Sequence, residues 1–254
     1  MTESDGNYNL EWKDNSSKPV LKRVNLPSVV HPVFEDIHHD KKLLDIVSDL
    51  IGPSIRYIQH DCLFLNYPDR GGCPIKWHQD WVFWPHTNQS LVTGFLSIDD
   101  SRRENGCLQV IPGSHKGPLY NHHDEDKFAS EINDANFDSS GAVHLEVPAG
   151  GISLHHPFTV HGSAVNQSNG PRRYFVFSFS ATDAWPLIGI VGKENELWGP
   201  VDWNRYCSSV VRGKASKFPR MEAIPVSLPV PFETESMDLF YSEQSKSIHG
   251  IPSY

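Results

Sequence analysis

His78, Asp80 and His161 are the residues of this sequence whose types and spacing suit a metal ion. His78 and Asp80 lie one residue apart in the segment WHQDWVFWPH (77–86), and residues i and i+2 of a strand point to the same face. His161, in FTVHGSAV (158–165), offers a third donor from another predicted strand. Two neutral imidazoles and one carboxylate, with other coordination positions open, form the facial triad of non-haem Fe(II) oxygenases. The set is therefore a candidate iron site.

An H-x-D triplet also has a plainer interpretation, because such a pair occurs by chance on many strands as surface or hydrogen-bonded residues. Further histidines compete for the third ligand position, namely His155 and His156 in SLHHP and His115 in PGSHK. The run NHHDED (121–126) resembles a metal cluster, but it falls in a polar insert at about 121–141 and is interpreted as a solvated loop.

Short strands are predicted to position these residues. After a helix predicted over 41–51, capped by Asp40 and stopped by Gly52-Pro53, the apolar period changes from helical spacing to two. Strand-like runs follow at 55–67, 91–99, 107–111, 143–147, 151–156, 159–165 and 172–181. Turn signals separate them, such as Asn105-Gly106, which suits a turn with positive φ. Phe175, Phe177 and Phe179 alternate along the last run and predict a core face. This pattern predicts a mainly β sandwich or barrel such as a jelly roll, with a few flanking helices.

Composition narrows the classes of function. A formal net charge of −9 argues against a nucleic-acid partner, which requires a basic field. The sequence has no apolar run of about 18 residues, which argues against a membrane span, and residues 1–18 are polar and irregular, without the apolar segment of a secretory signal. Four cysteines without a CxxC pair indicate reduced thiols and a cytoplasmic location. We interpret residues 1–254 as one domain, with a core at about 55–182 and an irregular region at 183–254 that could cover the active site.

The segment from about residue 56 to residue 184 resembles the phytanoyl-CoA dioxygenase family of Fe(II)/2-oxoglutarate-dependent oxygenases. The matching pieces are WHQDW, ENGCLQVIPGSHKG and HHPFTVHGSAVNQSNGPRRYF, in that order. The resemblance implies a double-stranded β-helix, with His78, Asp80 and His161 as iron ligands. It also implies that Arg172, eleven residues after His161, holds the distal carboxylate of 2-oxoglutarate, with help from Ser163. Only a planar guanidinium clamps a carboxylate with two parallel hydrogen bonds, and Arg173 on the opposite strand face is the rival.

Other site residues are predicted from family usage at one position or from residue type alone. Some members of this family use a polar side chain at the position of Gln59 against 2-oxoglutarate or substrate, and a strand hydrogen bond is the alternative. Aromatic candidates for the substrate pocket are Trp81, Phe83, Trp84 and Trp185, although aromatic residues on strands more often pack in a core. The sequence departs from the family in two respects. An N-terminal helical segment is not evident, and Leu96 or a neighbour stands where a tryptophan is usual.

The resemblance implies a dioxygenase that uses Fe(II), 2-oxoglutarate and O2 to hydroxylate a C–H bond of a small molecule, with release of succinate and CO2. A natural product or an amino-acid-like metabolite is the expected substrate class, because sparse lysines and the acidic balance argue against a CoA thioester. The carboxylate of Asp80 argues against halogenation. Two alternatives remain: a metal-dependent jelly-roll isomerase or hydrolase without 2-oxoglutarate, for which Arg172 would matter little, and a non-catalytic small-molecule binding protein.

Overall fold

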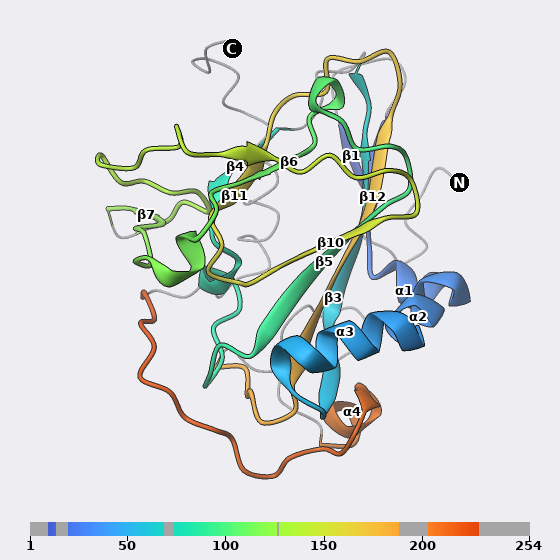
Figure 1. The fold of residues 1–254 in the computed structure, drawn as a ribbon, viewed down its shortest axis with the longest axis vertical. Coiled ribbons are helices and arrows are strands. Elements are labelled where there is room, and N and C mark those ends of the chain that lie inside the picture. Colours follow the sequence, from blue (N-terminus) through green and yellow to red (C-terminus); the bar gives the residue numbers. More distant parts are fainter. Residues whose placement is uncertain (1–9, 14–19, 69–73, 126, 188–202, 229–254) are drawn as a thin grey trace.

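Strands of this chain alternate between two facing sheets. The computed structural model describes residues 10–13, 20–68, 74–125, 127–187 and 203–228 (Figure 1). The larger sheet contains β1 (Leu10–Lys13), β2 (Val20–Asn25), β3 (Ile55–Asn66), β12 (Arg172–Ala181), β5 (Leu91–Ser97) and β10 (Ile152–His155), in that order, and β13 (Val210–Arg212) also pairs with β3. The smaller sheet has the order β4 (Ile75–His78), β11 (His161–Ser163), β6 (Leu108–Val110) and β9 (Val143–His144). All pairs are antiparallel.

The order in which the chain visits the two sheets identifies a jelly roll. From β3 to β6 each strand changes sheet, and β10, β11 and β12 do so again. Segments far apart in sequence therefore become neighbours, such as β3 beside β12 and β4 beside β11. The fold class predicted from the sequence, a mainly β double-stranded β-helix, is confirmed.

The outer face of the larger sheet carries the main core. Phe175, Phe177 and Phe179 of β12 are fully buried, as predicted, and pack against apolar residues of α3 (Lys41–Ile51). Gly94 of β5 lies opposite Phe177, and a Cβ there would come within 2.5 Å of the phenylalanine ring. The missing side chain thus makes room for a core ring.

Helix α3 begins and ends where the sequence predicts. The Asp40 side chain accepts a hydrogen bond from the Leu43 N–H at 2.8 Å, which caps the helix. Gly52, at φ 104°, ends it in a conformation that favours glycine. Gly106 likewise has φ 72°, as expected for the Asn-Gly turn before β6.

Several elements were not predicted. Leu10–Lys13 forms β1 inside the segment that was expected to be irregular, and two short helices, α1 (Pro27–Val30) and α2 (Pro32–His38), precede α3. The polar insert contains the hairpin of β7 (His123–Asp124) and β8 (Lys127–Phe128). The C-terminal region contributes α4 (Trp203–Ser208) and β13. These elements have two to seven residues, which are too few to show a periodic spacing of apolar residues. None of the described helices has the length and apolar character needed to cross a membrane.

Candidate metal centre

His78, Asp80 and His161 converge although 83 residues separate the first from the last. His78 ends β4, His161 begins β11, and the two are register partners in the smaller sheet. Asp80 opens a short 3-10 helix directly after β4. The Nε2 atoms of His78 and His161 lie 3.6 and 3.5 Å from Asp80 Oδ1, and ligand atoms of all three residues fall within 4.8 Å of one another. One cation can therefore contact all three side chains.

Both histidines are oriented to present an unprotonated nitrogen to a metal. His78 Nδ1 donates a hydrogen bond to the Lys76 carbonyl oxygen at 2.8 Å, and His161 Nδ1 donates to the Thr159 carbonyl oxygen at 2.9 Å. With the proton on Nδ1, each Nε2 keeps its lone pair. Burial lowers the pKa of His161 well below its ordinary value, so this imidazole is neutral. The donor set thus fits a divalent metal ion.

The Asp80 carboxylate is held by two further residues. Thr93 Oγ1 donates to Asp80 Oδ2 at 2.7 Å, and His155 Nε2 donates to the same oxygen at 3.1 Å. Oδ1 is left facing His78 and His161. Burial alone would raise the pKa of Asp80, but its surroundings, including the hydrogen bond from His155, outweigh this and hold the pKa well below its ordinary value. The acid is therefore ionised, as a ligand must be.

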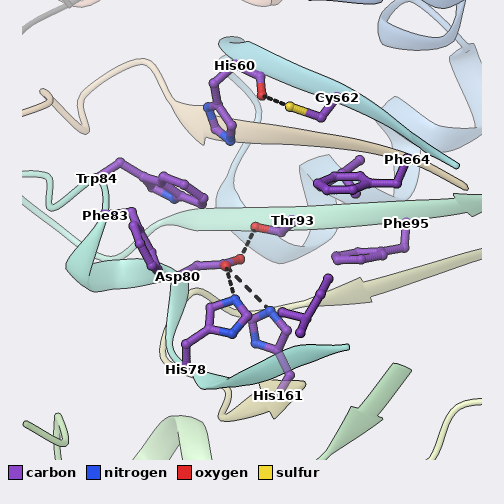
Figure 2. A pocket seen from close by; sticks show the side chains of 12 residues that line it. His60, Cys62, Phe64, His78, Asp80, Phe83, Trp84, Thr93, Phe95 and His161 are labelled. Atoms are coloured by element: carbon purple, nitrogen blue, oxygen red, sulfur yellow. Dashed lines mark hydrogen bonds and ion pairs between the residues drawn. The ribbon is translucent and has the colours of Figure 1, made fainter. Parts of the chain in front are cut away.

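A cavity of about 50 Å³ opens on the three donors (Figure 2). Figure 2 shows the imidazoles of His78 and His161 on one side of the cavity and His60 across it. The lining is otherwise mostly apolar and consists of His60, Cys62, Phe64, Ile75, His78, Asp80, Phe83, Trp84, Thr93, Phe95, His161 and Val176. The metal donors therefore have protein behind them and free space in front.

Arg172 lies behind one end of this cavity. Its Cζ is 4.4 Å from the centre of the Tyr174 ring, and that ring stacks on Phe64 and Phe95, which line the cavity. Arg172 is 2% exposed, and its Nε and Nη2 have no hydrogen-bond partner among the described residues. A buried guanidinium with two unused donors fits a carboxylate. Ser163, also buried, accepts a hydrogen bond from the N–H of the cavity residue Ile75 at 3.3 Å.

The aromatic candidates divide into two groups. Phe83 and Trp84 line the cavity. Trp81 does not: it is fully buried in a core cluster, and its Nε1 donates to the Pro225 carbonyl oxygen at 2.9 Å. Trp185 packs against Tyr206 with ring centres 5.0 Å apart and the rings tilted by 35°, and it is not part of the described lining.

Two further expectations concern Gln59 and the C-terminal region. Gln59 lies in β3, its side chain is outside the described residues, and its role stays a prediction. The described part of the C-terminal region, residues 183–187 and 203–228, contributes no residue to the lining. It packs instead behind the segment that follows the metal motif, where Asn88 donates to the Arg220 carbonyl oxygen at 3.1 Å.

The structure corrects one interpretation and makes another more specific. His122 and His123 are buried, so the run that contains them is not wholly a solvated loop. His122 Nε2 accepts a hydrogen bond from the N–H of Gln79 at 3.1 Å, directly between the two ligands of the HxD motif. On β5, where Leu96 or a neighbour was expected in place of a tryptophan, Phe95 faces the cavity and Leu96 packs on the outer core.

The sequence reasoning missed three residues that the structure places at the site. Thr93 and His155 hold Asp80, and His60 lines the cavity. His155 was weighed only as a rival ligand, and its Nε2 is occupied by Asp80 Oδ2. A signal for His60 existed in the alternation of β3, because Cys62 and Phe64 share its face.

Comparisons with known proteins agree with this geometry. The family model described as phytanoyl-CoA dioxygenase (PhyH) matches residues 13–174, more than half of the chain. A probable alpha-ketoglutarate-dependent hypophosphite dioxygenase of Stutzerimonas stutzeri is 31% identical over 245 residues, which cover 94% of this chain and 81% of that protein. The peroxisomal phytanoyl-CoA dioxygenase of Homo sapiens is 30% identical over 64% of this chain, and the match spans about half (52%) of its own length.

Solved structures with low sequence identity share the fold. SnoN, a non-heme alpha ketoglutarate dependent epimerase from nogalamycin biosynthesis, aligns with a TM-score of 0.60 at 17% identity, over 81% of this chain and 83% of that chain. EvdO2 from Micromonospora carbonacea var. aurantiaca, complexed with 2-oxoglutarate, aligns with a TM-score of 0.55 at 23% identity, over 77% of this chain and 83% of that chain. From the extent of the family match and the near full-length relative, it follows that this chain belongs to the phytanoyl-CoA dioxygenase family of Fe(II)/2-oxoglutarate-dependent oxygenases.

Proposed function

We propose that this chain oxidises a C–H bond of a small molecule, with Fe(II) held by His78, Asp80 and His161 and with 2-oxoglutarate and O2 as co-substrates. The balance is R–H, 2-oxoglutarate and O2 giving R–OH, succinate and CO2. The observation that carries the proposal is the convergence of three metal donors on a cavity that leaves their opposite side free. We also infer that residues 1–254 act as one oxygenase unit.

Arg172 and Ser163 are the residues proposed to hold 2-oxoglutarate. The unused Nε and Nη2 of Arg172 suit the distal carboxylate, and the Ser163 hydroxyl, which already accepts a hydrogen bond from Ile75, still has a proton to donate. The cavity residues next to them are apolar, with Ile75 beside Ser163 and with Phe64 and Phe95 beside Tyr174, and they suit the methylene carbons of the co-substrate.

The protein's part in the reaction is to position and to exclude water. When bound, Fe(II), 2-oxoglutarate and O2 supply the oxidising power. Asp80 is fixed through Oδ2, so that Oδ1 is the oxygen offered to the metal. Phe83 and Trp84 wall the side of the cavity away from Phe64 and Phe95. Aromatic walls keep bulk water from a reactive site and leave the bound substrate as the nearest group that can be oxidised.

Hypophosphite is a second candidate substrate. The relative from Stutzerimonas stutzeri, which matches 94% of this chain, is named for this compound, and the cavity is small. A P–H bond would then be converted to P–OH with the same consumption of 2-oxoglutarate and O2. The location proposed for the protein is the cytoplasm, a view supported by Cys107 and Cys207, which form no disulfide among the described residues.

The test is anaerobic addition of Fe(II) and 2-oxoglutarate to the metal-free protein. We expect a visible metal-to-ligand charge-transfer band, which requires both the metal and the chelating co-substrate. His161→Ala should abolish the band, because it removes one of three metal ligands, whereas His115→Ala, outside the cavity lining, should retain it. If the native protein forms no band, or if His161→Ala keeps it, the proposed site is wrong.

A further inference from the structure

His60 is a polar side chain of the cavity that the proposed chemistry does not yet use. It lies on β3 and is 9% exposed. Neither Nδ1 nor Nε2 has a hydrogen-bond partner among the described residues, although both atoms are buried. Buried polar groups in proteins are nearly always paired, so an unpaired imidazole on a cavity wall indicates a partner that arrives with a ligand.

Packing holds the His60 ring in place. It lies against Trp84, with ring centres 4.3 Å apart and an angle of 31° between the rings. Burial lowers the pKa of His60 to about 4, so the ring is neutral at neutral pH and offers one N–H donor and one lone pair. A fixed, neutral donor of this kind recognises an oxygen without bringing its own charge into an apolar cavity.

The cavity has two ends, and His60 lies at the one opposite to the co-substrate. Phe64 and Phe95 lead to Tyr174 and Arg172, the end proposed for 2-oxoglutarate. His60, Trp84 and Phe83 form the other end, as Figure 2 shows, with Asp80 between the two. A substrate at the His60 end would lie beside the metal donors without displacing the co-substrate.

The buried charge of Arg56 near His60 favours a ligand with an anionic hydrogen-bond acceptor. Arg56 precedes His60 by four residues on β3, is 2% exposed, and adds to the lowering of the His60 pKa. Arg56 Nε donates to Ser209 Oγ at 3.2 Å, and its Cζ is 4.8 Å from the centre of the Tyr206 ring. Its Nη1 has no partner, and it forms no ion pair with a carboxylate, among the described residues. The carboxylate of Asp80 acts on His60 with the opposite sign and more strongly. A divalent metal on Asp80 would offset that negative charge, and the buried Arg56 cation would then make this end of the cavity electropositive.

Size bears on the ligand as well. The cavity has a volume of about 50 Å³, and a water molecule needs about 10–15 Å³. The space in front of the metal donors is therefore small, which favours a compact substrate at the His60 end.

We propose that His60 is the substrate-recognising residue of this cavity and donates a hydrogen bond to an oxygen of a compact anion. The P–H or C–H bond of that anion that is to be oxidised then faces His78, Asp80 and His161. The inference rests on the proposed function and narrows its substrate class. Compact oxyanions such as hypophosphite, methylphosphonate and acetate are the probes; phytanoyl-CoA is the bulky comparator.

The experiment uses the full chain loaded with Fe(II) and 2-oxoglutarate. First, each probe is added anaerobically, and the change in the charge-transfer band is measured; succinate release in air is then followed as a function of probe concentration. At least one compact anion should perturb the band and stimulate succinate release, and phytanoyl-CoA should do neither. His60→Leu should raise the KM for that anion by about 10- to 100-fold, the usual effect of losing a hydrogen bond to a charged group. His60→Gln, which keeps an N–H donor, should recover part of the loss, and His115→Leu should behave as the native protein.

The outcomes separate the two proposals. If the native protein forms no band, the proposed function fails. If the band forms but no compact anion perturbs it, or if phytanoyl-CoA is the better substrate, the proposal for His60 is overturned. It is equally overturned if His60→Leu keeps the native KM while retaining the band. Because the band forms before substrate binds, its retention in both His60 variants also shows that they are folded.

Discussion

At the scale of single residues, two adjacent arginines have opposite environments. Arg172 is buried, with two unused donors, whereas Arg173 is exposed and pairs with both oxygens of Asp99 at 2.8 and 2.7 Å. The alternation of a strand predicts this division, because neighbouring side chains point to opposite faces. Substitution of Arg172 and substitution of Arg173 should therefore have different effects on function.

We expect Arg172→Lys to weaken 2-oxoglutarate binding by about 10- to 100-fold, because an ammonium cannot make two parallel hydrogen bonds to a carboxylate. Titration of the Fe(II) charge-transfer band with 2-oxoglutarate measures the change. Arg173→Lys is the matched control and should leave the midpoint unchanged. Equal midpoints in both variants would show that Arg172 does not hold the distal carboxylate of 2-oxoglutarate.

At the scale of elements, the pairing of β5 with β10 holds the metal-binding acid. Thr93 and His155 are register partners on these strands, and both donate to Asp80 Oδ2. A shift of one residue in that pairing would leave Thr93 and His155 on opposite faces of the sheet. The register therefore determines which carboxylate oxygen is left for the metal.

His155→Phe should weaken metal binding by about 10- to 100-fold, the usual effect of removing a residue that orients a ligand. Co(II) can replace Fe(II) as a spectroscopic probe, so the affinity is measurable without turnover. His155→Gln, which can keep a hydrogen-bond donor near Oδ2, should recover part of the lost metal affinity. His156→Phe changes the next residue along the chain, which does not contact Asp80, and should bind Co(II) as the native protein does. An unchanged Co(II) affinity in His155→Phe would show that Thr93 alone positions the acid.

Elements with a periodic spacing of apolar residues could be predicted from the sequence, whereas elements without such a spacing could not. Helix α3 has eleven residues with an apolar stripe, and β12 has ten with alternating phenylalanines, so both were identified. Helix α2 has seven residues and β7 only two, lengths at which spacing carries no signal. His155 was considered a rival ligand because a sequence shows that a histidine is near the site, but not which atom it contacts.

At the scale of the whole molecule, the jelly roll explains why the site residues are scattered along the chain. Ligands come from β4, the turn after it and β11, the proposed co-substrate arginine from β12, and the proposed substrate residue from β3. The pattern of strands predicted a sandwich or barrel, but the pairing order depends on contacts between distant segments. The family resemblance supplied that order for the ligands, and it could not supply His60 or His122, which are recognisable only from their burial and partners.

Buried and half-buried histidines outside the metal site should make the fold sensitive to acid. Burial lowers the pKa of His86 to about 3, and the pKa values of His122 and His156 to about 4. In the unfolded chain a histidine titrates near its ordinary value of about 6.5, so the unfolded state binds more protons once the pH falls below that value. Stability is therefore full above about pH 6.5 and is lost progressively as the pH falls toward the folded-state values.

For His86 alone the loss between pH 7.5 and pH 5 amounts to about 2 kcal/mol of unfolding free energy. Urea unfolding of the metal-free protein at a series of pH values measures it. His86→Asn keeps a donor for the Trp84 carbonyl oxygen, which His86 Nδ1 contacts at 2.7 Å, but it cannot take up a proton. We expect this variant to have a flatter pH profile by about that amount, whereas His115→Asn, at a partly exposed position, should keep the native profile. The prediction is wrong if the unfolding free energies of the native protein and of His86→Asn fall in parallel from pH 7.5 to 5. His86 would then titrate alike in the folded and the unfolded chain, contrary to its burial.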